Sequence, residues 1–170
     1  MKLYFSGFCL ENEEILFQEY KIQSQYCVSG FSYGAQKAFE YTLESTQRID
    51  TLQLFSPAFF QDKDEKYKRM QIMFFNKNPQ EYCKNFLQNC QFGNDAVDIE
   101  NYFAIGSSEE LQSLLHYEWD KEKLQKLLEK NIKIEVYLGS EDKIIDSSKA
   151  KDFFKQFSTV YFFKNKGHIL

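Results

Sequence analysis

Short apolar runs alternate along the chain with longer stretches in which apolar residues recur every three or four positions. The short runs are rich in Val, Ile, Leu, Phe and Tyr, and most of them end at Gly, Ser or Pro, which is typical of buried strands. These predicted strands are residues 2–6, 26–31, 51–56, 132–138 and 159–163. The longer stretches between them favour helices. These helices are predicted over residues 11–20, 34–45 and 147–157.

Strands that alternate with helices predict an α/β fold, in which a parallel sheet of about five strands has helices on both faces. Right-handed crossovers bring the carboxyl ends of parallel strands to one edge of the sheet. Residues that directly follow the strands are therefore expected to share that edge. They include Phe8, Ser32, Pro57, Asp142 and His168.

The alternation stops between about residues 62 and 130, where several helical segments follow one another. Pro79 is placed to begin one of these helices, and Ser107 or Ser108 to cap another. The region has no linker, repeat or low-complexity tract that would set it apart as a second domain. We therefore predict a single domain over residues 1–170, with residues 62–130 as a helical cap inserted into an α/β sheet.

The composition fits a stable aromatic core. Of the 170 residues, 43% are hydrophobic, with 18 Phe and 11 Tyr, and burial of one Phe or Leu side chain stabilises a fold by roughly 1.5–3 kcal/mol. The formal net charge of -4 argues against general nucleic-acid binding, which uses a basic surface. The apolar runs are too short for a transmembrane helix or a signal peptide. We therefore expect a soluble, cytoplasmic protein that binds neither membranes nor nucleic acid.

The chain has four cysteines, Cys9, Cys27, Cys83 and Cys90. None of them forms a C-x-x-C pair and the chain has two histidines, so no metal site is expected. In a reducing compartment the favoured interpretation is four small buried thiols.

The second predicted strand leads into Gly-Phe-Ser-Tyr-Gly, which places Ser32 between Gly30 and Gly34. A G-x-S-x-G pattern on a turn from strand to helix is the nucleophile elbow of hydrolases. The sharp turn leaves no room for side chains at the flanking positions, which glycine satisfies, and it lifts the hydroxyl above the sheet edge. The alternative is a tight turn whose serine merely caps the following helix.

A hydrolase of this architecture needs its acid and its base after the serine in the chain. Asp142 follows the fourth predicted strand and His168 follows the fifth, so order and placement both fit. Glu141 and Asp146 are alternatives for the acid, although Asp146 is better placed to cap the next helix. His116 is the other candidate base, but it is expected to be buried in a helical pattern. For His168 the alternative is an exposed histidine without a function.

These three side chains predict hydrolysis of an acyl ester. His168, oriented by Asp142, would take the proton of Ser32 while the hydroxyl attacks a carbonyl carbon. The candidate oxyanion hole consists of two backbone N–H groups, that of Tyr33 after the serine and that of Phe8 in the loop after the first strand. Because the imidazole must be neutral to act as a base, activity is expected to fall at acidic pH.

Several segments along the chain carry a resemblance to a known family. They are FSGFCLENE, VSGFSYGAQKAFEY, LQLFSPAFF, KRMQIMFFNKNPQEY, GSSEELQSLL, IEVYLGSEDKI and GHIL. In this combination the chain resembles, over nearly its whole length, the short pimeloyl-[acyl-carrier protein] methyl ester esterases of bacterial biotin synthesis. The resemblance implies a compact α/β-hydrolase fold, no cofactor, and removal of the methyl group from a pimeloyl chain on an acyl-carrier protein. Carried over by matching motif, it implies Ser32 as nucleophile, Asp142 as acid, His168 as base, and Phe8 and Tyr33 as oxyanion donors.

An acyl-carrier protein is acidic, so its docking site is expected to be basic. Lys66 and Arg69 lie three positions apart in the predicted cap, which places them on one face of a helix. They are the candidate carrier-binding residues. The alternative is an ordinary solvated helix face, which the nearby acids Asp62, Asp64 and Glu65 favour.

Three functions follow from these observations. The first is the carrier-protein methyl ester esterase. The second is a generic carboxylesterase or thioesterase that recognises no carrier protein. The third is a binding module on a hydrolase scaffold whose three site residues are inactive.

Overall fold

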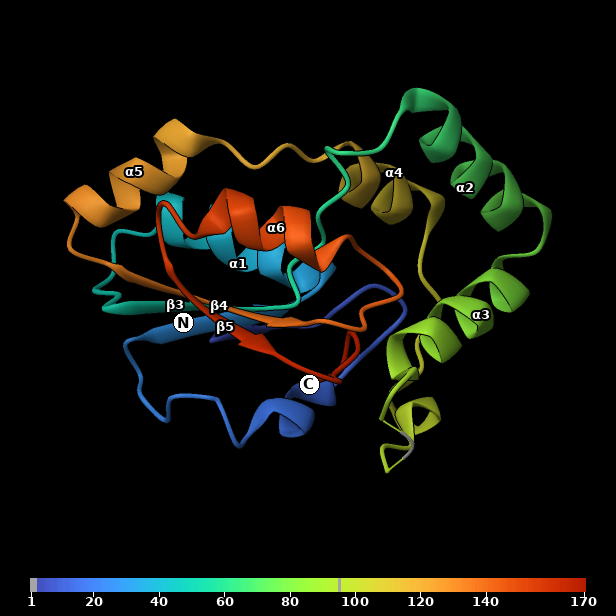
Figure 1. Cartoon of the computed structure of the whole chain (residues 1–170), viewed down its shortest axis with the longest axis horizontal. Coiled ribbons are helices and arrows are strands. Elements are labelled where there is room, and N and C mark those ends of the chain that lie inside the picture. The colour runs from blue at the N-terminus through green and yellow to red at the C-terminus, as the bar shows by residue number, and fades with distance from the viewer. Residues whose placement is uncertain (1–2, 95) are drawn as a thin grey trace.

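The computed structural model describes residues 3–94 and 96–170, and its centre is a five-stranded parallel sheet (Figure 1). The strands are β1 (Tyr4–Phe5), β2 (Cys27–Phe31), β3 (Thr51–Phe55), β4 (Lys133–Gly139) and β5 (Thr159–Phe163). They lie side by side in chain order, and each pairs in parallel with the next. The expected α/β fold is confirmed. Four predicted strands are present close to their predicted bounds, whereas the strand predicted over residues 2–6 is limited to Tyr4–Phe5, and residue 2 lies outside the described residues.

Three α-helices cover one face of the sheet (Figure 1). They are α1 (Tyr33–Glu44), α5 (Lys121–Glu129) and α6 (Ser147–Phe154). The strand residues on this face include Leu52, Leu54 and Val136, which are fully buried. The expectation of helices on both faces is wrong. The strands are added to the sheet in chain order, each on the same side of the one before it. Right-handed connections between such strands all lie on one face of the sheet.

The opposite face has no α-helix in the described part of the chain (Figure 1). The helix predicted over residues 11–20 is only a short 3₁₀ helix, η1 (Glu13–Phe17), after which a loop crosses the sheet. The ring of Phe17 packs on Phe31 and Phe55, with centroids 4.8 and 4.7 Å away. Aromatic side chains and a loop therefore cover this face in place of helices. Because the connection from β1 to β2 runs over this face, it has the opposite handedness to the others.

A cap of three helices stands beyond the carboxyl ends of the strands (Figure 1). It consists of α2 (Glu65–Lys77), α3 (Pro79–Gln91) and α4 (Ser108–His116), with a 3₁₀ helix η2 (Ile99–Tyr102) between α3 and α4. Pro79 begins α3, as predicted. Ser107 rather than Ser108 caps α4, in a reciprocal pair of hydrogen bonds with Glu110. Since α5 packs on α1 and β4, residues 62–130 supply both the cap and one helix of the layer over the sheet.

None of the helices formed by the described residues is long and apolar enough to cross a membrane.

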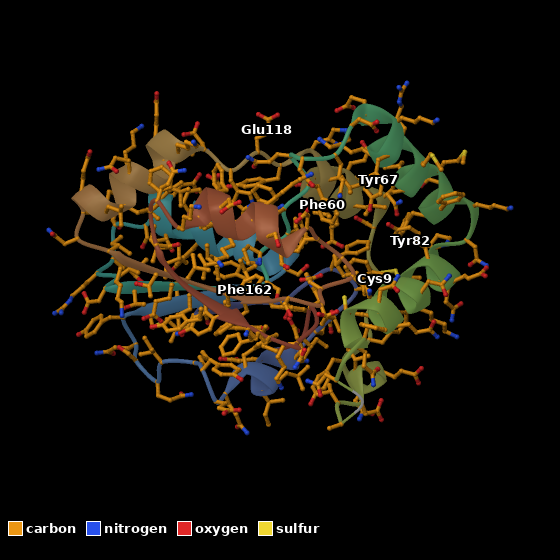
Figure 2. The ribbon with its side chains drawn as sticks, viewed as in Figure 1. Cys9, Phe60, Tyr67, Tyr82, Glu118 and Phe162 are labelled. Atoms are coloured by element: carbon orange, nitrogen blue, oxygen red, sulfur yellow. A yellow bond between two sulfur atoms is a disulfide. The ribbon has the colours of Figure 1, made fainter. Side chains whose placement is uncertain are left out.

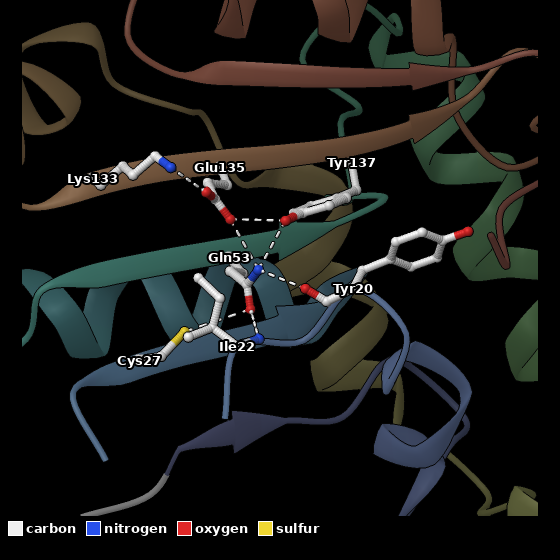
Figure 3. A network of polar contacts seen from close by, with 7 residues as sticks. All are labelled: Tyr20, Ile22, Cys27, Gln53, Lys133, Glu135 and Tyr137. Atoms are coloured by element: carbon white, nitrogen blue, oxygen red, sulfur yellow. Dashed lines mark hydrogen bonds and ion pairs between the residues drawn. The ribbon is translucent and has the colours of Figure 1, made fainter. Parts of the chain in front are cut away.

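A buried carboxylate lies on the face that the helices leave free. Glu135 on β4 is 3% exposed, and its oxygens accept hydrogen bonds from the side chains of Gln53 (3.0 Å) and Tyr137 (2.8 Å). The ammonium of Lys133 lies 2.6 Å from the same carboxylate (Figure 3). Burial opposes the negative charge, but these three donors outweigh it and hold the pKa of Glu135 below its usual value.

Gln53 extends this network to the loop that crosses the sheet. Its amide nitrogen also donates to the carbonyl oxygen of Tyr20 at 3.0 Å, and its amide oxygen accepts the N–H of Ile22 at 2.9 Å. Figure 3 shows these contacts on both sides of the amide. The loop is therefore fastened to β3 and β4 by side-chain hydrogen bonds.

We expect Glu135→Gln to lower the free energy of unfolding at neutral pH by about 2 kcal/mol, because it removes charge-assisted hydrogen bonds in a buried site. A carboxyl whose pKa is lowered by folding stabilises the protein at neutral pH, and this stabilisation disappears as the pH falls through the folded-state pKa. The difference between wild type and variant, measured by urea unfolding, should therefore stay constant near neutral pH and shrink as the pH falls below 4.5, the ordinary pKa of this carboxyl. Glu129→Gln, on the exposed side of α5, is the control. A difference that does not change with pH would contradict this role.

Candidate active site

Ser32 lies on a sharp turn between β2, which ends at Phe31, and α1, which begins at Tyr33. Its backbone angles are φ 53° and ψ -114°, a region that residues other than glycine rarely adopt. The residue is 2% exposed. Its side chain makes no capping hydrogen bond to α1, so the interpretation of a serine that merely caps the helix is wrong.

The two glycines beside the serine are required by close backbone contacts. A Cβ atom on Gly30 would lie 2.2 Å from the carbonyl oxygen of Gly34, and a Cβ atom on Gly34 would lie 2.0 Å from the carbonyl oxygen of Phe5. Both distances are far shorter than a van der Waals contact. The G-x-S-x-G pattern therefore reflects the packing of β1, the turn and α1 against one another.

Ser32, His168 and Asp142 form one chain of hydrogen bonds. Oγ of Ser32 lies 2.9 Å from Nε2 of His168, and Nδ1 of His168 lies 2.6 Å from Oδ2 of Asp142. The imidazole and the carboxylate are both fully buried. With its proton on Nδ1, a neutral imidazole donates to Asp142 and leaves Nε2 free to accept the proton of Ser32. The structure thus brings together the three side chains singled out in the sequence.

Two backbone N–H groups fix the carboxylate of Asp142. Its Oδ1 accepts hydrogen bonds from the N–H of Ile144 at 2.7 Å and of Ile145 at 3.0 Å. Oδ2 is left to accept from His168. This division of the two oxygens sets the rotation of the carboxylate, and through it the plane of the imidazole.

The other candidate acids and the other candidate base lie elsewhere. Glu141 is exposed, and Asp146 caps α6 by accepting a backbone N–H in the first turn. His116 is exposed on α4 rather than buried, and its Nε2 lies 3.5 Å from the carboxylate of Glu65 on α2. Within residues 3–94 and 96–170, no cluster of three or more His, Cys, Asp or Glu side chains could hold a metal ion.

The predicted oxyanion donors, Phe8 and Tyr33, lie in the loop after β1 and at the start of α1. Among the described residues, none accepts a hydrogen bond from the backbone N–H of either. The N–H of Gly7, in contrast, donates to Oε1 of Glu13 at 2.8 Å. The ring of Phe8 packs edge-on against Phe86 of the cap. The two free N–H groups suit an oxyanion hole, and that role stays a prediction.

Glu13 was not singled out by the sequence, because it is one of several acids in a polar segment. The structure buries it completely, and the same oxygen that binds Gly7 also accepts the hydroxyl of Tyr4 at 2.9 Å. Burial and the neighbouring Glu13 raise the pKa of Tyr4. Glu13 thereby holds the loop that contains Phe8 against β1.

Cys9, in the same loop, forms a disulfide with Cys83 on α3. The expectation of four thiols is therefore wrong for this pair, while Cys27 and Cys90 are buried free thiols. The two cysteines are 74 residues apart, so no local sequence pattern could predict that they pair. Burial and the charge of Asp142 raise the pKa of Cys90, so its thiol stays protonated and unreactive.

A pocket of about 540 Å³ lies between the three cap helices and the loop after β4. Phe60, Tyr67 and Tyr82 line it and lie close together between the cap and the sheet layer (Figure 2). Ile144, another wall residue, follows Asp142 by two positions and is bound to its carboxylate. The pocket therefore comes close to the loop that carries the candidate acid, while Ser32, Asp142 and His168 themselves are not among its wall residues.

Lys66 and Arg69 are both exposed on α2. No ion pair of either residue is found in the part of the chain that the structure describes, and Arg69 makes one hydrogen bond to the carbonyl oxygen of Glu65. Lys68, in contrast, is buried, and Lys63 pairs with a neighbouring aspartate. Lys66 and Arg69 thus carry unpaired positive charge on this helix.

Comparison with known proteins gives the class of fold. No family model and no curated protein matches the chain, but many solved structures do. MGS-M2, an α/β-hydrolase enzyme from a deep-sea metagenome of the Medee basin, superimposes with a TM-score of 0.66 at 10% identity, over 98% of this chain and 81% of that one. An esterase from Exiguobacterium antarcticum gives 0.64 at 17% identity, over 83% and 59%.

A third match is closer in size to the whole chain. BioG from Haemophilus influenzae superimposes with a TM-score of 0.56 at 14% identity, over 99% of this chain and 88% of that one. Identities this low define the fold and nothing finer. Together with the strand order and the elbow, they show that the chain has the α/β-hydrolase fold.

Reduction of the Cys9–Cys83 disulfide is expected to lower the free energy of unfolding by roughly 2–4 kcal/mol, because the cross-link restricts a long loop of the unfolded chain. Thermal unfolding with and without dithiothreitol measures this effect. In the Cys83→Ala variant, the reductant should leave the melting temperature unchanged. Thiol titration of the denatured, unreduced wild type should find only the two thiols of Cys27 and Cys90. Four reactive thiols before reduction would contradict the pairing.

Proposed function

We propose that the chain is a serine ester hydrolase in which Ser32 is the nucleophile, His168 the base and Asp142 the orienting acid. The observation that carries this proposal is the pair of hydrogen bonds from Ser32 to His168 and from His168 to Asp142. The α/β-hydrolase fold supports it, because nucleophiles of that fold stand on an elbow of this kind.

The geometry suits a two-step acyl transfer. As Oγ of Ser32 attacks the ester carbonyl, its proton passes to Nε2 of His168, and Asp142 stabilises the imidazolium that forms. The N–H groups of Phe8 and Tyr33 hold the oxyanion, and loss of one such donor costs roughly 10²–10³ in rate. His168 then protonates the departing alcohol. Water repeats the sequence on the acyl-serine and releases the acid.

The substrate that we propose is the methyl ester of a pimeloyl chain on an acyl-carrier protein, hydrolysed to methanol and the free acid in biotin synthesis. The sequence resemblance supports this choice, and the pocket under the cap is compatible with it. Its volume of about 540 Å³ falls within the range of small-molecule sites, roughly 300–1,000 Å³. Its lining combines aromatic and aliphatic side chains, which suit an acyl chain, with polar ones such as Gln71, Asn85 and Lys143.

The second candidate is a carboxylesterase or thioesterase that recognises no carrier protein. The same hydrogen-bonded side chains and the same pocket would serve it. The two functions differ in the partner, so carrier-bound and free esters of equal acyl length separate them.

We expect Ser32→Ala to lower kcat for the pimeloyl-carrier methyl ester by roughly 10⁴–10⁶-fold, because no other group can form the acyl intermediate. Methanol release measured by coupled oxidation follows the reaction. Ser29→Ala, which changes another buried serine, on β2, is the matched control and should keep near wild-type activity. Labelling by a fluorophosphonate should modify Ser32 in the folded wild type. If no adduct forms there and no ester is hydrolysed, the protein is a binding module on a hydrolase scaffold.

For the carrier protein we propose a docking site at Lys66 and Arg69. Both side chains are exposed and free of ion pairs within the described chain, and an acidic partner would supply the opposite charges. They lie on α2, which forms the outer edge of the cap (Figure 1). A carrier bound there would present its acyl arm to the pocket that α2 lines.

The charge reversal Lys66→Glu with Arg69→Glu should raise KM for the carrier-bound ester at least about tenfold, with KM for a free methyl ester changed less than about twofold, because exposed interface charges steer the partner and not the chemistry. The control is Lys126→Glu on α5 with Lys130→Glu directly after its end, which makes the same change in net charge at the far end of the molecule (Figure 1). Steady-state kinetics at low and high salt measure the difference. Equal effects on both esters, or equal effects of both reversals, would remove the docking site.

A cytoplasmic location is part of this proposal. Free Cys27 and Cys90 are compatible with a reducing compartment, whereas the Cys9–Cys83 disulfide counts against one, since disulfides are rare in cytosolic proteins. The thiol titration described above, carried out on protein extracted under acid quench, measures the redox state in the cell.

A further inference from the structure

The last residue of β3 and the loop after it contact the backbones of both Ser32 and His168. The N–H of Ser32 donates to the carbonyl oxygen of Phe55 at 2.9 Å, and the N–H of Ala58 donates to the carbonyl oxygen of Ser32 at 3.0 Å. Between these two positions, the hydroxyl of Ser56 donates to the carbonyl oxygen of His168 at 2.6 Å. Residues 55–58 therefore hold the nucleophile and the base at the same time.

Ser56 has an unusual backbone conformation. Its φ is 40°, in the left-handed region that favours glycine, and it precedes Pro57, a position that favours extended backbone. The residue is fully buried, and its N–H donates to the carbonyl oxygen of Tyr137 on β4 at 2.8 Å. Such a conformation costs free energy and persists where the surroundings hold it, which is often at functional sites.

Two further backbone hydrogen bonds lie near His168. The N–H of Ile169 donates to the carbonyl oxygen of Cys90 at 3.3 Å, which leads to α3 of the cap, and the N–H of Glu141 donates to the carbonyl oxygen of Lys166 at 2.8 Å, which leads to the loop after β4. The contact from Ser56 is shorter and leads to the sheet, the same element that carries Ser32. Asp142 sets the rotation of the imidazole but leaves the position of the backbone to these anchors.

We propose that Ser56 is a positioning residue for His168, an inference that rests on the proposed ester hydrolase. Its hydroxyl fixes the backbone of the base relative to the backbone of the nucleophile, so that Nε2 stays within hydrogen-bond distance of Oγ. A base must lie within roughly 2.6–3.2 Å of the group that it deprotonates. Displacements of about 1 Å can lower a rate by roughly 10². Ser56 does not touch the reacting atoms and acts through His168.

Two variants test this role. Ser56→Ala and Ser56→Gly both remove the hydroxyl, and glycine also tolerates the φ of 40°, so it keeps the loop conformation if alanine disturbs folding. With p-nitrophenyl butyrate as substrate, we expect kcat to fall about 10–100-fold in both variants, with KM changed less than about twofold. The rate of fluorophosphonate labelling of Ser32 should fall in parallel.

The matched control is Ser29→Ala, which removes another buried serine hydroxyl bonded to a backbone carbonyl, that of Leu3. Its kcat should stay within about twofold of wild type. A second readout is the proton resonance of His168 Nδ1, which lies in the short contact with Asp142. This resonance should be sharp in wild type and in Ser29→Ala, and broadened by exchange in both Ser56 variants.

Unchanged kcat in Ser56→Gly, or a loss of melting temperature without a loss of kcat, would overturn the positioning role. If wild type hydrolyses free esters but not the carrier-bound ester, the proposed substrate fails, and the kinetic test of Ser56 is unaffected. If wild type neither hydrolyses esters nor takes up the label, the proposed hydrolase function fails. The resonance of His168 Nδ1 is then the only test of the positioning role of Ser56. A resonance as sharp in Ser56→Gly as in wild type would then refute the role.

Discussion

The hydrogen bond between Ser32 and His168 joins residues that are 136 positions apart, and the arrangement of the strands serves to make it possible. β2 delivers the serine and β5 the histidine, with β3 and β4 between them. The loops after β4 and β5 must therefore bend inward and meet. A Cβ atom on Gly139 would lie 2.2 Å from the carbonyl oxygen of Gly167, so these loops pack backbone against backbone. Glycine at such crossings lets distant strands present their side chains at one point.

The sheet that carries Ser32 and His168 is covered differently on its two faces. One face follows the usual rule, with aliphatic strand residues under amphipathic helices. The other face uses stacked aromatic rings and the buried carboxylate of Glu135, which binds three donors. A carboxylate inside a protein is tolerated where its partners replace the lost water. Here one of those partners, Gln53, also holds the loop over the sheet. This loop covers the face of the sheet, as a packed helix does on the other face.

Features that depend on a local pattern could be predicted from the sequence. The five strands followed from short apolar runs, and Ser32 followed from glycines at fixed offsets. Asp142 and His168 followed from their places after β4 and β5, because parallel strands end at a common edge. The position of the helices could have been deduced only from the strand order, which no local pattern contains.

Features that depend on folding alone were missed. The Cys9–Cys83 pair arises because α3 passes over the loop after β1. Glu13 looks like its acidic neighbours until the fold buries it. Ser56 lies in a Ser-Pro pair that suggests a plain turn, and its contact with His168 exists because two loops cross. His116 fits a helical pattern yet faces solvent, since α4 packs on its leucine side and not on its histidine side.

The Cys9–Cys83 disulfide also limits how the cap can move relative to the sheet. Because α3 is covalently joined to the segment next to Phe8, it cannot swing away without pulling on that segment. α2 packs on both α3 and α4, so the three cap helices form one packed group with α3 bonded to the loop after β1. Any movement of α3 is therefore transmitted to the loop that carries Phe8, so the shape of the cap and the position of the Phe8 N–H group are coupled.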